Sequence, residues 1–201
     1  MFDDEELRKT LRDISKANDE AKQHASRSTE LERALIDAIQ VRVPKGLNEA
    51  AFRVCNEKYA EAMKGVYKRF PDDLDIASLY ADSIMNLSAW DLWDLKTGEP
   101  TKGARSLEAK DILEKALQQD GAHQHPGVPH LYIHLMEMSR TPEVALNCAD
   151  HLRKLAPDAG HLVRSPFPNV YLSRVASQPT AGYKNVDAFA SLGVSLNVIL
   201  N

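Results

Sequence analysis

The sequence predicts an all-α protein of about seven or eight antiparallel helices, stacked as helical hairpins of the tetratricopeptide type. Through most of the 201 residues, apolar side chains recur three or four positions apart, which is the spacing of one helix face. Short breaks rich in Pro, Gly and Asp separate these stretches. No stretch alternates apolar and polar residues as a half-buried strand does, so we expect no substantial sheet.

The first part of the chain, residues 1–46, is expected to form a helical arm. Its apolar spacing predicts helix from residue 3 to residue 39 with one break. The break covers residues 26–29, and Thr29 together with Glu32 matches a capping box. A Val-Pro-Lys-Gly run at residues 43–46 then stops the helix.

The expected repeat core covers residues 47–163 of a single domain. Apolar stripes bounded by turn residues predict helices over residues 48–70, 74–87, 105–119 and 142–155, besides a histidine-rich helix, with an inserted loop over residues 90–104. Val54, Leu107 and Val144 are among the side chains expected to face inward. The last segment, residues 164–201, is rich in Pro and Gly and is expected to wrap irregularly around the core.

The composition excludes several classes of function. The net charge is −4 and basic residues are interspersed with acidic ones, so no nucleic-acid partner is expected. No apolar run approaches the roughly 20 residues that span a bilayer, and the acidic N-terminus matches no targeting signal, which predicts a cytoplasmic protein without a membrane partner. Cys55 and Cys148 are expected to be buried free thiols. Whether the chain forms a homodimer is left open.

The central motif is a histidine-rich stretch that begins at His123. Four of the seven histidines lie between His123 and His134, and Pro129 marks the expected start of a helix. On that helix His130, His134 and Glu137 lie at positions i, i+4 and i+7, which places them on one face. Two imidazoles and a carboxylate in this pattern predict a site for a divalent metal, with zinc as the expected ion. The alternative is that these histidines only form hydrogen bonds within a buried helix.

Four blocks of the sequence stand out: LYADSIMNL at residues 79–87, WDLW at 90–93, HPGVPHLYIH at 125–134 and AGHL at 159–162. In this order they resemble blocks of a family of tetratricopeptide-like proteins of microbes and fungi. The chain resembles that family over roughly residues 48–163. Family members follow the Gly-His-Leu block with a second histidine-rich motif, but this chain has Val-Arg-Ser-Pro at 163–166, so any ligand from that motif is absent.

The size, the helical content and the His-Pro-Gly block are also similar to small zinc enzymes of fungal quinolone alkaloid clusters. These are the viridicatin synthases, or cyclopenases, which are described as hemocyanin-like. The resemblance implies a zinc-dependent lyase of secondary metabolism that converts a cyclopenin-type benzodiazepinedione to a viridicatin-type quinolone. The implied reaction contracts the seven-membered ring and eliminates a methyl isocyanate unit. Only one His-x-x-x-His pair is present, which favours a single metal over a copper pair.

The sequence alone does not identify the third metal ligand or the catalytic groups. A catalytic zinc site has three protein ligands and one open position. Besides His130 and His134, the candidate third ligands are Asp82, His125, Glu137 and His161. Asp82 occupies a position that resembles one in the family. If it is not a ligand, it is expected to form a hydrogen bond to one of the ligating histidines. If Glu137 is not a ligand, it is expected to act as a general base or to form an ion pair with Arg140.

Aromatic residues near these histidines are candidates for contacts with a small aromatic substrate. Trp90 and Trp93 would form a wall for a flat ligand, or else a hydrophobic plug at the end of two helices. Tyr132 is a further substrate candidate, although its position in the repeat favours the core. The competing hypothesis for the whole chain is a tetratricopeptide-type module that binds a protein or peptide. Its basic residues do not line up into the carboxylate clamp that such grooves often use.

Overall fold

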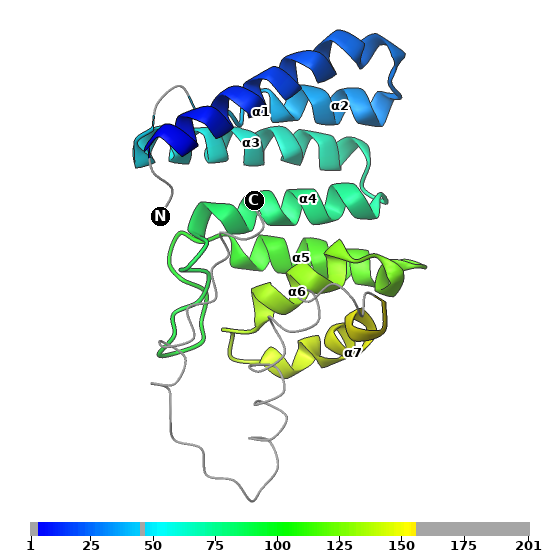
Figure 1. The fold of residues 1–201 in the computed structure, drawn as a ribbon. Helices are drawn as coiled ribbons and strands as arrows, with labels where there is room; N and C mark the ends of the chain where they lie inside the picture. The colour runs from blue at the N-terminus through cyan, green and yellow to red at the C-terminus, as the bar shows by residue number, and fades with distance from the viewer. Residues whose placement is uncertain (1–3, 45–46, 156–201) are drawn as a thin grey trace, which may run out of the picture. The chain divides into compact units, whose positions relative to one another are not determined.

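The computed structural model describes residues 4–44 and 47–155 of the chain. In these ranges seven α-helices and four short 3₁₀ helices follow one another. Figure 1 labels the α-helices along the ribbon. The one extended pairing in the same ranges is an isolated bridge between Trp93 and Pro100. The predicted all-α fold is therefore confirmed for the described residues, and so is the approximate number of helices. The irregular wrap predicted for residues 164–201 lies outside the described residues.

The chain divides into two compact units, Met1–Leu87 and Ser88–Asn201. The division falls inside the predicted repeat core, just before the loop predicted to be an insertion. The single-domain organisation stays a prediction, and each unit is described by itself below. No helix in the described ranges is both long enough and apolar enough to cross a membrane.

The first unit consists of four helices that pack in chain order, the first on the second, the second on the third and the third on the fourth. They are α1 (Asp4–His24), α2 (Glu30–Ile39), α3 (Glu49–Arg69) and α4 (Leu74–Met85). The short 3₁₀ helix η1 (Ala25–Arg27) separates α1 from α2, close to the predicted break. The side chain of Thr29 accepts a hydrogen bond from the backbone N–H of Glu32, and the Glu32 carboxylate accepts one from the backbone N–H of Thr29. The predicted capping box is therefore confirmed.

Local side chains also fix where α3 and α4 begin. Asn48 accepts a hydrogen bond from the third residue after it, and Asp73 does the same at the start of α4. Such N-caps satisfy backbone N–H groups that the helix itself leaves without acceptors. The helix starts expected at residues 48 and 74 therefore agree with the structure to within one residue.

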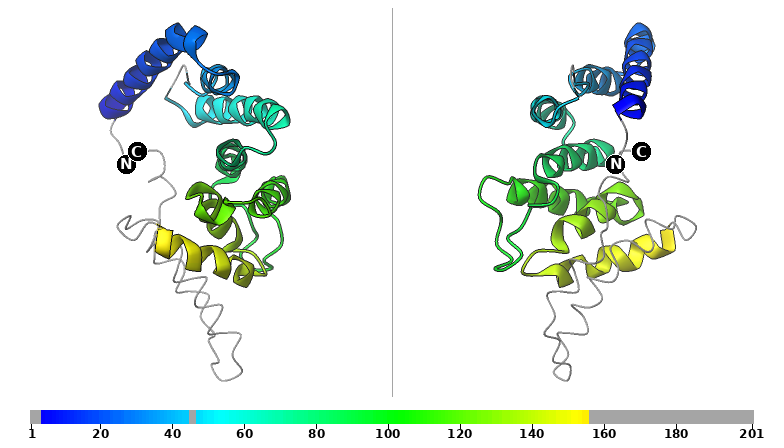
Figure 2. Two further views of the ribbon diagram at one scale, coloured as in Figure 1. Left: turned by 90° about the vertical axis from the view of Figure 1, so that its right-hand side faces the viewer. Right: turned by 60° about the vertical axis from the view of Figure 1, so that its left-hand side comes forward.

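The second unit is built around α6 (Gly127–Met136), which contacts both α5 (Ser106–Leu117) and α7 (Leu146–Leu155). The short helices η3 (Ala122–Gln124) and η4 (Pro142–Ala145) connect these elements, and η2 (Asn86–Ser88) follows α4. Figure 2 shows α5, α6 and α7 from two further sides. Every residue of α6 after Gly127 is buried, because helices pack on more than one of its faces.

Three side chains that were expected to face inward are exposed instead. The exposed fraction is 47% for Val54, 61% for Leu107 and 46% for Val144. These predictions were wrong. Each residue lies near the start of its element, where the neighbouring helices do not cover it. Apolar spacing identifies the buried face of a helix but not how far along that face the neighbour extends.

Candidate functional site

The histidine pair is held by α6 in the second unit. His130 and His134 are one turn apart, and only 6% and 4% of their surfaces are exposed. Their rings meet edge to face, with centroids 4.5 Å apart. Burying an ionisable side chain costs free energy unless it has suitable partners. The two adjacent imidazole side chains project from a helix that is packed on several sides. They are therefore the strongest candidate for a chemical site in the second unit.

Glu137 contacts one of these histidines. Its Oε1 atom lies 3.1 Å from Nδ1 of His134, and its side chain is 14% exposed. A carboxylate at Nδ1 favours the tautomer with a proton on that nitrogen and fixes the ring orientation. Arg140, the other partner considered for Glu137, forms an ion pair of 2.9 Å with Glu99. The general-base role of Glu137 stays a prediction.

His125 lies at the start of α6 rather than along its face. Its Nδ1 atom accepts a hydrogen bond of 3.1 Å from the backbone N–H of Val128. The first N–H groups of a helix have no acceptor within the helix, so His125 stabilises the first turn of α6. The same bond requires a lone pair on Nδ1, so any metal ligation by His125 would have to use the other ring nitrogen. Metal ligation by His125 stays a prediction.

Asp82 belongs to the first unit, where its neighbours come from two other elements. Burial raises the pKa of the Asp82 carboxyl group, while the Arg42 guanidinium and Asn86 act in the opposite direction. The Arg42 guanidinium also lies 4.6 Å from the centre of the Tyr59 ring on α3. The Asp82 side chain therefore belongs to a half-buried polar cluster of the first unit. Its proposed catalytic or ligand role is not tested by these contacts.

The two tryptophans differ sharply in exposure. Trp93 is 5% exposed, and its indole N–H donates a 2.5 Å hydrogen bond to the backbone oxygen of Leu135. Trp90 is 58% exposed. The environment of Trp93 is that of a plug against the end of α6, which was the structural alternative. Contact between Trp90 or Trp93 and a substrate stays a prediction, and Trp90 has the more accessible ring.

Tyr132 links α6 to α5. Its hydroxyl group donates a 2.9 Å hydrogen bond to the Glu114 carboxylate, which also pairs with Lys110 at 2.8 Å. Burial, and then the adjacent carboxylate, raise the pKa of Tyr132 far above its usual value. The ring itself is buried. These contacts agree with a core position, and a role in substrate binding stays a prediction.

The described residues do not complete a metal site. Within residues 4–44 and 47–155, no three His, Cys, Asp or Glu side chains gather closely enough to hold a metal ion. The donor chemistry of the pair nevertheless suits zinc, which binds imidazole nitrogen readily. His161, one of the candidate third ligands, lies outside the described residues.

Other features of the second unit were not apparent from the sequence. The ring of His123 stacks on that of His151, with centroids 4.5 Å apart, although the two residues are distant in the chain.

The two cysteines differ in burial. Cys148 is buried, which raises its pKa to about 12, whereas Cys55 of the first unit is half-buried. Both cysteines are free, as predicted, but only Cys148 is fully buried.

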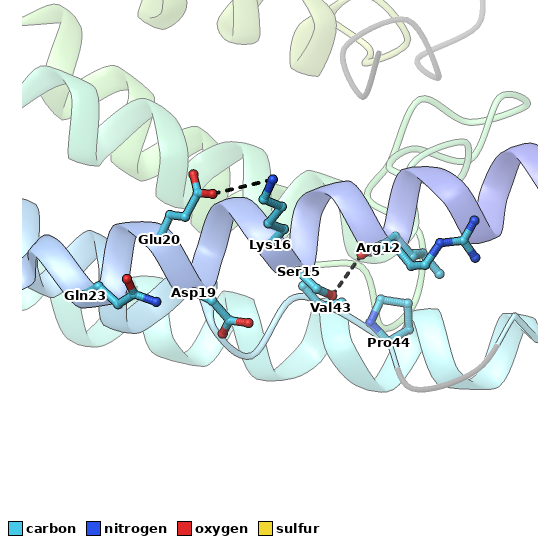
Figure 3. Close-up of a pocket in the computed structure, with 9 residues that line it drawn as sticks. Arg12, Ser15, Lys16, Asp19, Glu20, Gln23, Val43 and Pro44 are labelled. Atoms are coloured by element: carbon cyan, nitrogen blue, oxygen red, sulfur yellow. Dashed lines mark hydrogen bonds and ion pairs between the residues drawn. The ribbon is translucent and has the colours of Figure 1, made fainter.

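A groove in the first unit lies along α1 beside residues 43–44. It has a volume of about 670 Å³, and Figure 3 shows the side chains that line it. Most of them are polar or charged and come from α1, including Lys16 and Glu20, whose charged groups are 3.9 Å apart. None of the predicted site residues lines this groove.

Comparisons with known proteins do not assign the chain to a family. No family model matches it, and neither a curated protein nor a solved structure matches it.

Proposed function

We propose that the chain is a zinc-dependent lyase in which His130 and His134 are metal ligands. The observation that supports this is the pair of buried imidazoles on α6, with Glu137 at Nδ1 of His134. Metal-binding histidines commonly give their second nitrogen to a carboxylate, which fixes the ring and raises its basicity. In this proposal His134 would hold the zinc ion through Nε2, and Glu137 would orient the ring.

The third ligand in this proposal is His161 or His125. His125 would bind through Nε2, because Val128 occupies its Nδ1 atom. Zinc, when bound, polarises a carbonyl or epoxide oxygen of the substrate as a Lewis acid. The protein residues would hold the aryl group against the exposed ring of Trp90 and move a proton through the carboxyl group of Glu137.

The proposed substrate is a cyclopenin-type benzodiazepinedione, and the proposed product is a viridicatin-type quinolone. The basis is the resemblance of the His-Pro-Gly block to that of the viridicatin synthases. We also propose that the hairpins are of the tetratricopeptide type. The packing of α3 on α4 and of α5 on α6 supports this assignment, since each pair joins two successive helices.

A second candidate function is a helical-repeat module that binds a peptide and uses its histidines only structurally. Two contacts favour it. His125 caps the first turn of α6, and His134 has an acidic partner three residues later on the same helix. In that case neither histidine needs a metal.

Turnover of cyclopenin separates the two functions. The lyase should lose its activity in a chelator and regain it on addition of zinc, with or without oxygen. His130→Ala should abolish turnover, whereas His24→Ala, which changes a histidine of the exposed end of α1, should not. Full turnover after complete removal of metal would contradict the zinc mechanism. A zinc-loaded protein that leaves cyclopenin-type substrates unchanged would favour the binding module.

A further inference from the structure

The segment of residues 88–105, which we call the insert, is attached at two points, one at the C-terminal end of α6 and one at Arg140, four residues after that helix ends. The first is Trp93, whose indole N–H donates to the backbone oxygen of Leu135. The last four carbonyl groups of a helix have no donor within that helix. Leu135 belongs to this group because α6 ends at Met136. Trp93 therefore acts as a C-terminal cap of α6, and it is buried in doing so.

The second attachment joins Gly98 and its neighbours to Arg140. The backbone N–H of Arg140 donates to the oxygen of Gly98 at 3.1 Å, and its Nε atom donates to the oxygen of Thr97 at 3.3 Å. Its guanidinium also pairs with Glu99 at 2.9 Å. Gly98 has a φ of +69°, and a Cβ atom at this position would lie 2.8 Å from the backbone nitrogen of Arg140. Only glycine fits this close contact without a shift of the backbone.

The insert is itself held in shape. The Asp94 carboxylate accepts hydrogen bonds from the backbone N–H groups of Lys96 and Thr97, both at 2.9 Å. At its base, the oxygen of Leu92 accepts hydrogen bonds from the Thr101 backbone and from the hydroxyl group of Ser106, which begins α5. Through these hydrogen bonds the insert connects the start of α5 to the end of α6.

The two attachments lie on either side of Glu137. Leu135 directly follows His134, and Arg140 comes one turn after Glu137. We propose that the insert is a clamp that fixes the last turn of α6, with Trp93 and Gly98 as positioning residues for the contact between His134 and Glu137. This inference rests on the proposed function, because the clamp is proposed to hold His134 in the orientation in which it binds the metal.

The first test replaces Trp93 by Phe, which keeps the aromatic bulk and removes the N–H donor. The matched control is Trp90→Phe on the same insert, where the ring is exposed. The probe is Co²⁺, which replaces zinc and whose visible absorption reports the ligand geometry. We expect Trp93→Phe to weaken Co²⁺ binding about tenfold or more and to change the spectrum, by analogy with residues that support metal ligands. Trp90→Phe should leave both unchanged.

The second test compares Gly98→Ala with Gly103→Ala. Both glycines have positive φ values, +69° and +91°, so both substitutions strain the backbone. A Cβ atom at Gly103 meets nothing within 4 Å, whereas one at Gly98 meets the backbone of Arg140. Any loss of Co²⁺ binding found for Gly98→Ala and not for Gly103→Ala therefore comes from the contact with Arg140.

Hydrogen exchange in the metal-free proteins provides a measurement that does not depend on the proposed function. The backbone N–H of Glu137 closes the last turn of α6 through a 2.9 Å bond to Ile133, and that of Ser139 closes the turn that follows through a 3.0 Å bond to Met136. Their exchange should become about fivefold faster or more in Trp93→Phe and Gly98→Ala than in the two controls.

The outcomes separate the clamp from the metal site. Co²⁺ binding, spectra and exchange that match the controls in both Trp93→Phe and Gly98→Ala would refute the clamp. A wild-type protein that binds no Co²⁺ would refute the proposed function. In that case the exchange rates alone decide whether the insert fixes the end of α6.

Discussion

Glu137 and His134 form an acid–imidazole pair at the end of α6, with 3.1 Å between Oε1 and Nδ1. Both side chains are largely shielded from solvent, with 14% and 4% of their surfaces exposed. The pair lies on the same helix as His130, whose ring touches that of His134 edge to face. If the helix binds a metal, Glu137 sets the orientation of one ligand and does not need to be a ligand itself.

This relationship predicts the effect of Glu137→Gln. The amide can still contact His134, but it carries no charge and supports the ring less strongly. We expect the zinc affinity to fall by about tenfold or more, while the metal still binds at high concentration. Titration of the metal-free protein with zinc in the presence of a competing indicator measures the change. The control is Glu143→Gln, which changes an exposed glutamate of η4 that takes part in neither the pair nor the insert. An unchanged affinity in Glu137→Gln would remove Glu137 from the site.

Asp82 predicts a pH dependence for the stability of the first unit. Burial raises the pKa of this carboxyl group in the folded state, although Arg42 opposes the shift. Between the ordinary value of about 3.9 and the raised value, the folded state binds more protons than the unfolded chain. The contribution of Asp82 to the free energy of unfolding is therefore fully present below the ordinary value and is lost as the pH rises through the raised one.

Asp82→Asn should remove this part of the pH dependence, because the amide does not titrate. Urea unfolding between about pH 4 and about pH 7 measures the difference, with the exposed Asp72→Asn as the control. A wild-type protein and an Asp82→Asn variant with parallel pH profiles would show that Asp82 is not in the described environment.

Removal of the Tyr132 hydroxyl group is expected to lower the stability of the second unit. Tyr132→Phe removes the hydrogen bond to Glu114 and keeps the buried ring, so we expect a cost of about 1 kcal/mol in the free energy of unfolding. Lys115→Ala is the control, since its ion pair with Asp111 is exposed on both sides and contributes little. If Tyr132→Phe instead leaves stability unchanged and impairs turnover, the hydroxyl group acts on the substrate.

The capping box predicts a similar cost in the first unit. Thr29→Ala removes the side-chain acceptor at the start of α2 and should lower the free energy of unfolding by about 1 kcal/mol. Thr10→Ala provides the comparison. Its hydroxyl group donates to the oxygen of Glu6 within α1, a helix interior where alanine is the better residue. Equal stability of the two variants in thermal unfolding would contradict the capping role of Thr29.

The positions of the helices could be predicted because the signals that set them are local. The capping box at Thr29 and the N-caps at Asn48 and Asp73 depend on residues only three positions apart. The spacing of His130 and His134 likewise required only the period of the helix. These features follow from the sequence without knowledge of the tertiary packing.

The partners of the site residues could not be predicted in the same way. Glu137 has His134 three residues before it and Arg140 three residues after it, so helical spacing does not choose between them. Arg140 forms its ion pair with Glu99 of the insert, and Trp93 reaches the backbone of Leu135. Contacts between segments so far apart in the chain depend on how the insert folds against α6, and no local pattern encodes that packing.

The central claim is that α6 carries a metal site, and metal analysis of the purified protein tests it most directly. The protein should be purified without a metal-affinity tag, and its zinc content measured by elemental analysis beside that of the His130→Ala, His134→Ala double variant. We predict about one zinc per chain in the wild type and little in the double variant, because the remaining ligands bind zinc weakly. Equal zinc in both proteins, or none in the wild type after incubation with zinc, would contradict the claim.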